Sequence, residues 1–394
     1  MPTILDAIEH TKRGRLQEAE AIYLELLSAQ PDDADALHYL GVLRMGQRRR
    51  DEAIELVSRA LKVAPRNAHA WNSLGNMVAS TGKLAAAEFA FKSALELQPD
   101  FLEALYNLGN LQRRMRKREE ALQSFRRVVE LNPKLSVAHE NIAMLLFRLK
   151  RTDEAAAAFR RWAEADPGNA IARHMLAAYS NQAPERADDA YVATLFDRMS
   201  GYFDQSLERL GYAAPQLLTS ALAEVIPFGE KRLVMLDAGA GTGLCGPLLR
   251  SSAHKLVGVD LSPGMLAKAR ERNVYDELHE GELVAFMRAH PAEYDLVISA
   301  DTLVYFGQLE DAFSTAAGAL KPGGILAFTL EAEPAGSPGK HRLNQHGRYS
   351  HSGDYVRECL AGAGLQLVQL EAGVLRKEMG ADVHGHVVLA RKPA

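Results

Sequence analysis

Apolar, small and proline positions recur every 34 residues through the first 180 residues of the chain. Prolines keep this interval at Pro31, Pro65, Pro99, Pro133 and Pro167, and alanines keep it at Ala19, Ala53, Ala87, Ala121 and Ala155. Small residues allow the two helices of a pair to approach closely, an aromatic residue fills the remaining gap, and proline ends the second helix. The pattern predicts one shortened repeat, a capping helix near 170–180, and between them four full repeats at 34–67, 68–101, 102–135 and 136–169.

After the repeats the pattern changes twice. The polar segment 181–189 predicts a linker. Apolar residues from Leu195 to Leu210 then recur three or four positions apart, which predicts an amphipathic helical cap within 190–230.

From Leu233 onward, short apolar runs alternate with helical stretches, as a parallel sheet with crossover helices requires. Two further strands, near 365–370 and 386–390, are expected at an antiparallel edge. The chain is therefore predicted to be multidomain, with an all-α superhelix over 1–180 and an α/β Rossmann-like domain over 190–394.

Composition narrows the class of protein. The chain is 47% hydrophobic and 24% charged, as is usual for a soluble globular protein, and no apolar stretch approaches the roughly 20 residues needed to span a membrane. Only Cys245 and Cys359 occur, which excludes a disulfide framework, and the residues from Met1 to Asp6 lead us to expect no export. We expect a cytoplasmic protein with no metal site and no membrane partner.

Charge is shared unevenly but modestly. Residues 1–180 carry a net charge of +3 and residues 181–394 a net charge of −7. This asymmetry does not favour nucleic-acid binding, and no nucleic-acid partner is expected.

The segment with the clearest chemistry runs from Leu236 to Gly243, where Asp237 is followed by Gly239, Gly241 and Gly243. It follows a buried strand, and glycines there let the backbone approach a nucleotide-like ligand. One interpretation is a dinucleotide site, because Gly241-x-Gly243-x-x-Gly246 with Asp260 fits that fingerprint. However, a carboxylate is unfavourable beside a pyrophosphate at a helix N-terminus, whereas it suits an ammonium group.

The run D-x-G-x-G-x-G resembles the first motif of S-adenosylmethionine-dependent methyltransferases. Asp260-Leu261-Ser262-Pro263-Gly264-Met265-Leu266 resembles the segment after their second strand, and Leu320-Lys321-Pro322-Gly323-Gly324 resembles the turn into their fifth. The resemblance implies that Asp260 binds the ribose hydroxyls and that Glu282 stands where the family commonly has an Asp facing the adenine amino group. The predicted cofactor-binding residues are Asp237, Gly239, Gly241, Gly243, Asp260, Leu261, Glu282, Leu283 and Ala300.

Polar residues after the fourth and fifth strands are candidates for the acceptor side. Methyl transfer needs mainly an in-line nucleophile held close, with a base only for a protonated acceptor. Histidine is the natural base near neutral pH, and arginine suits a carboxylate substrate. The predicted catalytic residues are His351, Tyr349, His346 and Asp301, and the predicted substrate-binding residues are Arg348, Arg376, Tyr305, Tyr202 and Phe203. The absence of an N/D-P-P-Y/F sequence after the fourth strand argues against methylation of a nucleobase amino group.

The repeats resemble tetratricopeptide repeats, on the period and on Trp71-Asn72-Ser73-Leu74-Gly75. In that family the first helix of each pair lines a concave groove that binds peptides or proteins. An asparagine ladder on these helices offers both donors and acceptors to an extended peptide, although it is equally consistent with ordinary polar groove positions. The ladder consists of Asn72, Asn76, Asn107, Asn110 and Asn141.

Taken whole, the chain resembles bacterial methyltransferases that carry N-terminal tetratricopeptide repeats. The resemblance includes Leu195-Phe196-Asp197 and Gly347-Arg348-Tyr349-Ser350-His351-Ser352. It implies S-adenosylmethionine as cofactor and an O or N acceptor, either a peptide or protein bound by the repeats or a small molecule. Two alternatives stay open: an NAD-dependent oxidoreductase using the same crevice, and a repeat scaffold with an inactive methyltransferase-like half.

Overall fold

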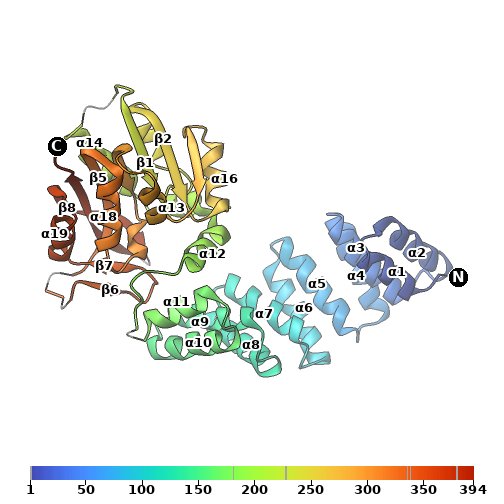
Figure 1. Ribbon diagram of the computed structural model, residues 1–394. Coiled ribbons are helices and arrows are strands. Elements are labelled where there is room, and N and C mark those ends of the chain that lie inside the picture. The colour runs from blue at the N-terminus through green and yellow to red at the C-terminus, as the bar shows by residue number, and fades with distance from the viewer. Residues whose placement is uncertain (1, 181, 227–228, 335, 338, 379) are drawn as a thin grey trace. The chain divides into compact units, whose positions relative to one another are not determined.

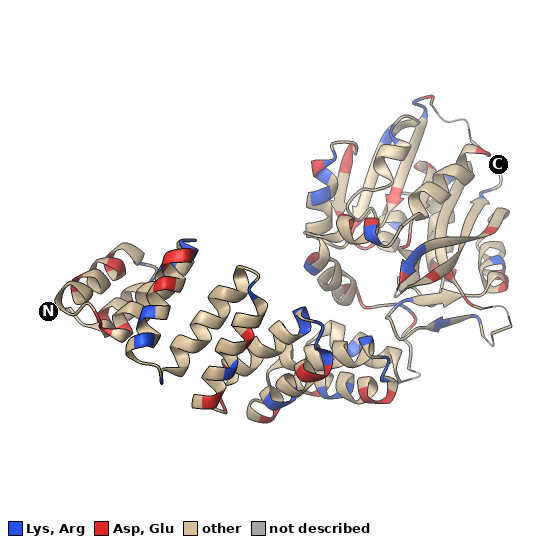
Figure 2. Ribbon diagram, turned by 180° about the vertical axis from the view of Figure 1, so that it is seen from behind, with Lys and Arg blue, Asp and Glu red and all other residues tan. Residues whose placement is uncertain are grey.

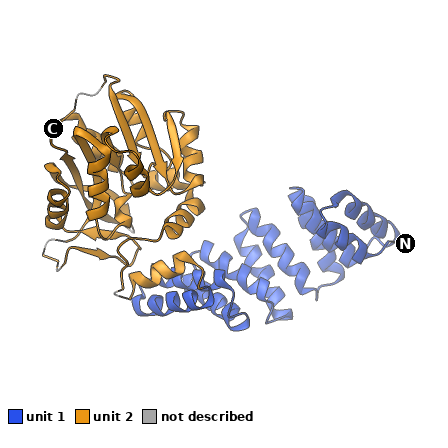
Figure 3. Cartoon of the chain, viewed as in Figure 1, with its two compact units in different colours: residues 1–166 blue, residues 167–394 orange. Residues whose placement is uncertain are grey.

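The computed structural model describes residues 2–180, 182–226, 229–334, 336–337, 339–378 and 380–394 (Figure 1). Contacts divide the chain into two compact units, Met1–Asp166 and Pro167–Ala394 (Figure 3). The division lies earlier than the boundary expected at residue 180, because helix α11 (Ala170–Ala178) packs against α12 (Asp189–Met199) of the second unit. Asn181, where the predicted linker begins, is outside the described residues.

The first unit is an array of helix pairs, and its full repeats begin at the predicted residues 34, 68, 102 and 136. Its helices are α1 (Ile4–Lys12), α2 (Leu16–Ala29), α3 (Ala34–Gly46), α4 (Arg50–Val63), α5 (Ala68–Ser80), α6 (Leu84–Leu97), α7 (Leu102–Arg114), α8 (Arg118–Leu131), α9 (Ser136–Arg148) and α10 (Thr152–Ala165).

Close packing within each pair depends on a small residue that faces a large one. A Cβ added at Gly75 would lie 2.6 Å from the ring of Phe91, and one added at Gly109 would lie 2.9 Å from the ring of Phe125. Both rings are almost completely buried. The predicted pairing of small and aromatic positions is therefore confirmed, and it sets how closely the helices approach.

Ion pairs connect successive repeats along the array. Arg44 pairs with Glu20 at 2.7 Å, and Lys117 pairs with Glu88 at 2.6 Å. Figure 2 shows both signs of charge along these helices. Each of these pairs has one buried partner, Arg44 or Glu88, and both pairs lie beside the apolar layers that stack the repeats.

The second unit alternates helices and strands. Besides α11 and α12, its helices are α13 (Phe203–Arg209), α14 (Ala214–Ala223), α15 (Gly246–Leu249), α16 (Pro263–Glu271), α17 (Leu283–Ala289), the 3-10 helix η1 (Leu303–Tyr305), α18 (Glu310–Ala319) and α19 (Gly353–Gly362). Its strands are β1 (Leu233–Ala238), β2 (Ala253–Asp260), β3 (Glu277–Glu280), β4 (Tyr294–Ser299), β5 (Leu320–Ala332), β6 (His341–Leu343), β7 (Tyr349–His351), β8 (Gln366–Glu378) and β9 (Ala381–Arg391).

These strands form one sheet. The order β3-β2-β1-β4-β5 is parallel throughout, and β9 then pairs antiparallel with both β5 and β8. The predicted antiparallel C-terminal edge is thus confirmed. Met235, Leu256, Leu296 and Ile325 are buried in the core of the sheet, so the polar chemistry is confined to the loops at its carboxyl edge.

The segment predicted as a linker is held firmly against the loop after β4. The amide of Ala187 donates to the carbonyl of Tyr305, and the amides of Gly307 and Gln308 both donate to the carbonyl of Glu185, each at 2.8 Å. This segment is therefore part of the second unit's structure. Separately, no helix within the described part of the chain is long and apolar enough to cross a membrane.

The turn between the two helices of each repeat contains a residue with positive φ. Glycine occupies this position in two repeats, whereas Arg48, Arg116 and Lys150 occupy it at φ values of 64°, 61° and 58°. A side chain in this left-handed region costs roughly 1–2 kcal/mol. Three of the five turns therefore carry local backbone strain that the packed repeats must hold.

Substitution at this turn position should affect stability according to the residue already present. Gly82→Ala, at φ 81° with no atom within 4 Å of the new Cβ, should lower the free energy of unfolding. The expected loss is about 1 kcal/mol, because it adds only left-handed strain. Arg116→Ala is the matched control and should change stability little, since that backbone already carries the strain. Urea denaturation followed by circular dichroism measures both, and equal losses in the two variants would contradict the explanation.

Candidate active site

The glycine loop after β1 combines two kinds of glycine. Gly239, at φ 84°, lies against the side chain of Thr302, which any added Cβ would overlap. Gly241, at φ 55°, has no atom within 4 Å of the position that a Cβ would take. The first glycine is required by the fold, and the second leaves open space next to the loop backbone.

Asp260, the last residue of β2, connects the glycine loop to the next loop. Its Oδ2 accepts a hydrogen bond from the amide of Gly241 at 2.8 Å, and its Oδ1 accepts one from the amide of Ser262 at 2.9 Å. Burial raises the pKa of Asp260, while these two amides favour its ionised form. A carboxylate oxygen can accept more than one hydrogen bond, so both oxygens retain acceptor capacity for a ligand hydroxyl.

Asp237 lies beneath the glycine loop. Its carboxyl is 1% exposed and accepts a hydrogen bond from the hydroxyl of Tyr275 at 2.6 Å. Burial raises the pKa of Asp237 to about 7. The ring of Tyr275 lies 2.9 Å from the position of an added Cβ on Gly243, so Asp237 and Tyr275 support the loop from below. The contact of Asp237 with a ligand ammonium stays a prediction.

Two aspartates of the predicted helical cap bind the loops after β1 and β2. Asp197 of α12 accepts hydrogen bonds from the hydroxyl of Ser262 and, at 3.1 Å, from the amide of Gly264. Asp204 of α13 accepts a hydrogen bond from the hydroxyl of Thr242. The family resemblance includes Asp197, but the sequence alone assigned neither aspartate a role, because cap and loop are 38 or more residues apart.

The two aromatic residues predicted for the substrate lie differently. Tyr202 is 54% exposed. Phe203 packs edge-on against Phe196, whose ring in turn meets Tyr305 at a centroid distance of 5.6 Å. Phe203 is thus connected to Tyr305 only through Phe196. Tyr202 faces solvent.

The other predicted cofactor residues lie at neighbouring strand ends. Leu261 follows β2, Leu283 begins α17 after β3, and Ala300 follows β4. Glu282 caps α17 by accepting from the amides of Val284 and Ala285, and it also pairs with Arg186 at 2.9 Å. Its carboxylate is therefore already engaged by helix and linker. The strand order brings these residues together at the carboxyl ends of the parallel strands, next to Asp237 and Asp260.

A buried ionic cluster lies where β4, β5 and β8 meet a polar turn. Arg376 is 4% exposed and uses all three guanidinium nitrogens, on Asp301, Glu331 and Glu378. Arg348 binds Glu331 and Glu378, each at 2.6 Å. The predicted residues Asp301, Arg348 and Arg376 are thus brought together. Glu331 and Glu378 complete the cluster, and neither had a signal in the sequence.

The cluster keeps Glu331 charged and its histidine neutral, whereas burial raises the pKa of Asp301 against the attraction of Arg376. Burial opposes ionisation of Glu331, but Arg348 and Arg376 outweigh it and lower the pKa of this carboxyl. Burial lowers the pKa of His346 to about 4. The Nδ1 atom of His346 accepts from the amide of Arg348 at 3.3 Å, and its Nε2 faces Glu331 at 3.4 Å. Both ring nitrogens are therefore engaged within the cluster.

Two predicted catalytic residues lie elsewhere. Tyr349 and His351 are fully buried; the Tyr349 hydroxyl donates to the carbonyl of Pro184 at 2.6 Å, and His351 Nε2 lies 3.1 Å from the carbonyl of Gly307. Both side chains hold backbone segments in place, which argues against a role in proton transfer. Tyr305, by contrast, is 8% exposed; burial raises the pKa of its hydroxyl to about 12, and Arg348 and Arg376 oppose this rise.

Several side chains of the predicted asparagine ladder already form hydrogen bonds within the first unit. Asn72 is 4% exposed, donates to Glu103 at 3.0 Å and accepts from Asn107 at 3.1 Å. The side-chain amide of Asn141 donates to the carbonyl of Val137, four residues earlier on its own helix. Asn76 is exposed and Asn110 half-buried.

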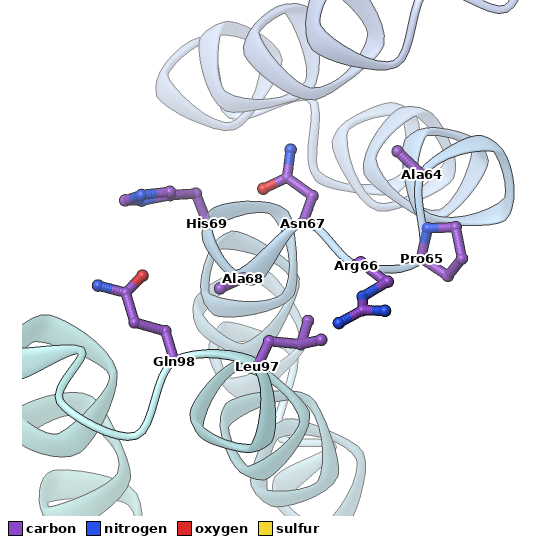
Figure 4. A pocket seen from close by; sticks show the side chains of 8 residues that line it. All are labelled: Ala64, Pro65, Arg66, Asn67, Ala68, His69, Leu97 and Gln98. Atoms are coloured by element: carbon purple, nitrogen blue, oxygen red, sulfur yellow. The ribbon is translucent and has the colours of Figure 1, made fainter.

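The first unit also has an open hollow of about 760 Å³ on its surface (Figure 4). It is lined by the turn 64–69 together with Leu97 and Gln98. None of the predicted groove asparagines lines it. In the described part of the chain, no group of three His, Cys, Asp or Glu side chains could hold a metal ion.

The raised pKa of Asp237 predicts a pH dependence of stability. The folded protein keeps a proton, up to about pH 7, that the unfolded chain releases near 3.8. This carboxyl therefore lowers stability as the pH rises through that window. Asp237→Asn should remove this component, so the free energy of unfolding of the variant relative to the wild type should increase between about pH 5 and pH 7. Urea denaturation at a series of pH values measures it, and a difference independent of pH would contradict the assignment.

Two family models match this chain, one in each half. Residues 236–328 match the model of a methyltransferase domain, and residues 40–100 and 106–170 match that of a tetratricopeptide repeat. A malonyl-(acyl-carrier protein) O-methyltransferase of Enterobacter lignolyticus is 31% identical over 37% of this chain and 55% of the relative. The methyltransferase-like protein 27 of Homo sapiens is 30% identical over 40% of this chain and 64% of the relative. The crystal structure of MamA is 23% identical, with a TM-score of 0.39 over 42% of this chain and 96% of that chain.

The matched relatives are covered only in part, since the chain spans little more than half the length of the first of them. The two family matches nevertheless fall on the two halves that the structure distinguishes by their secondary structure. Residues 40–100 and 106–170 are thus similar to tetratricopeptide repeats, and residues 236–328 are similar to a methyltransferase domain.

Proposed function

We propose that the second unit binds S-adenosylmethionine at its glycine loop and transfers the methyl group to an oxygen or nitrogen acceptor. The observation that carries the proposal is the open space at Gly241, bordered by the carboxylate of Asp260. A loop that brings its backbone to a ligand next to a ribose-binding acid is the arrangement that a nucleoside cofactor needs.

The residues present fit this cofactor. Asp260 has acceptor capacity for the ribose hydroxyls, and the apolar residues Leu261, Leu283 and Ala300 follow strands β2, β3 and β4. Glu282 is held by Arg186 and by the start of α17, so its contribution to adenine recognition would be limited to the remaining lone pairs. When bound, S-adenosylmethionine supplies an electrophilic methyl carbon.

The chain's own contribution is binding and orientation. Asp197 and Asp204 hold the two ligand loops from the side of the cap. The ionic cluster fixes Arg348 and Arg376 near the end of β4, where a nucleophile can be held close to the cofactor. The repeats supply a surface for a peptide or protein, either the methyl acceptor itself or a partner that delivers a small acceptor.

Ligand binding tests the proposal directly. Calorimetric titration of the full chain should show binding of S-adenosylmethionine and S-adenosylhomocysteine and no binding of NAD. Binding of NAD instead would favour an oxidoreductase, and binding of none of the three would favour a scaffold with an inactive domain. Transfer of a tritiated methyl group from S-adenosylmethionine into a cell extract then reports the activity.

Two glycine variants should separate folding from cofactor binding. Gly239→Ala should lower the melting temperature, because its Cβ overlaps Thr302. Gly241→Ala enters open space and should leave the melting temperature within a few degrees of the wild type. Its methyl group should nevertheless weaken S-adenosylhomocysteine binding about tenfold, or about 1.4 kcal/mol, by occupying ligand space. Unchanged affinity of folded Gly241→Ala would place the ligand elsewhere.

A further inference from the structure

Helix α11 belongs to the repeats by sequence and to the second unit by its contacts. It begins at Ala170, one 34-residue step after Ser136, the first residue of α9. His174 on α11 therefore occupies the repeat position held by His38, Asn72, Tyr106 and Glu140 in the preceding repeats. In α11 this face is covered by residues of the second unit.

The side chain of His174 is buried against residues of the second unit. It is 4% exposed, and its ring stacks on Tyr191 with a centroid distance of 3.8 Å and an interplanar angle of 19°. Its Nε2 lies 2.8 Å from the carbonyl oxygen of Gly347. Burial lowers the pKa of His174, so the ring is neutral near pH 7 and its Nε2–H donates to that carbonyl.

Gly347 lies in the tight turn that carries Arg348. Its amide donates to the carbonyl of Asn344 at 2.8 Å, and the amide of Asn344 donates to the carbonyl of Arg348 at 2.9 Å. Gly347 has a φ of 87°, and a Cβ there would lie 2.7 Å from the hydroxyl of Tyr191. The turn is therefore held by its own hydrogen bonds and by α11 and α12.

The same turn determines where the acceptor-side charges lie. His346 and Arg348 both project from it into the ionic cluster, where they meet Glu331. Tyr191 also meets Tyr305 at a centroid distance of 6.3 Å, so α12 contacts the loop after β4 as well. A displacement of Gly347 would move Arg348 relative to Glu331 and Glu378.

We propose that His174 is a positioning residue of the acceptor site, which fixes the turn at Gly347 and through it the guanidinium of Arg348. The inference rests on the proposed function in calling this cluster the acceptor site. In this proposal α11, the helix that continues the repeat register, helps to position the acceptor site of the second unit. The hydrogen bond itself is independent of any ligand.

Three variants of the full chain test the role. His174→Ala removes the donor, and His174→Gln returns an N–H donor near the same place. His38→Ala is the matched control, because His38 occupies the same repeat position, is 3% exposed and hydrogen-bonds Ser73 at 2.9 Å within the first unit.

Hydrogen exchange of the ligand-free chain is the first measurement. In His174→Ala, amides of 344–351 should exchange about fivefold faster than in the wild type, as expected for the loss of one hydrogen bond. His174→Gln should restore most of the protection, and His38→Ala should leave this segment unchanged. Unchanged exchange in His174→Ala, or the same acceleration in His38→Ala, overturns the proposal.

Methyl transfer from tritiated S-adenosylmethionine into a cell extract is the second measurement. In His174→Ala the extract concentration giving half-maximal transfer should rise about fivefold, matching the lost hydrogen bond, while S-adenosylhomocysteine affinity stays unchanged. An equal loss of cofactor affinity would point to general damage and overturn the positioning role. If the wild type binds no cofactor, the proposed function fails, whereas the exchange experiment still decides whether His174 holds the turn.

Discussion

The carboxylate of Asp260 makes the contact on which the rest of the proposed cofactor site depends. One oxygen holds the amide of Gly241 and the other holds the amide of Ser262, so a single side chain fixes the loops after β1 and β2 to each other. Each loop would otherwise lose its conformational entropy separately when a ligand binds. Asp197 and Asp204 repeat this arrangement from the cap, since each accepts a hydrogen bond from one of the same loops. The site is therefore preorganised by acids that hold backbone and hydroxyl donors.

The acceptor side is organised by a different kind of interaction. Two arginines and three carboxylates are packed together with little access to water, and burying such groups costs desolvation energy that their attraction only offsets when every group is paired. All three guanidinium nitrogens of Arg376 are engaged, which meets that requirement. The cluster connects the loop after β4, strands β5 and β8, and the turn 344–348. Its main effect is to define the relative positions of these segments at the sheet edge.

The sequence period and the packing place the boundary between the two halves of the chain at different residues. The 34-residue register continues into α11, because the spacing of small and apolar residues reports how a helix can pack. It does not report which neighbour covers the helix. The contacts of His174 with Tyr191 and Gly347 place α11 in the second unit, and the predicted linker is likewise fixed by backbone hydrogen bonds to residues 305–308. Both outcomes include a partner more than 100 residues away along the chain, Gly347 for α11 and residues 305–308 for the predicted linker.

The sequence by itself determined the helix pairs and their register, the parallel sheet with its antiparallel edge, and the glycine loop followed by Asp260 at the end of the next strand. These features follow from short-range constraints, namely hydrophobic period, proline and glycine geometry, and the residues that follow a strand. Only the tertiary structure decided which polar residues act together. Arg376 meets Asp301 across 75 residues of chain and Glu331 across 45, while Tyr349 and His351, within three residues of Arg348 in sequence, bind backbone carbonyls instead. Side chains alternate between the faces of a strand, so neighbours in sequence reach different surroundings, and only the packed fold selects the partner of each charge.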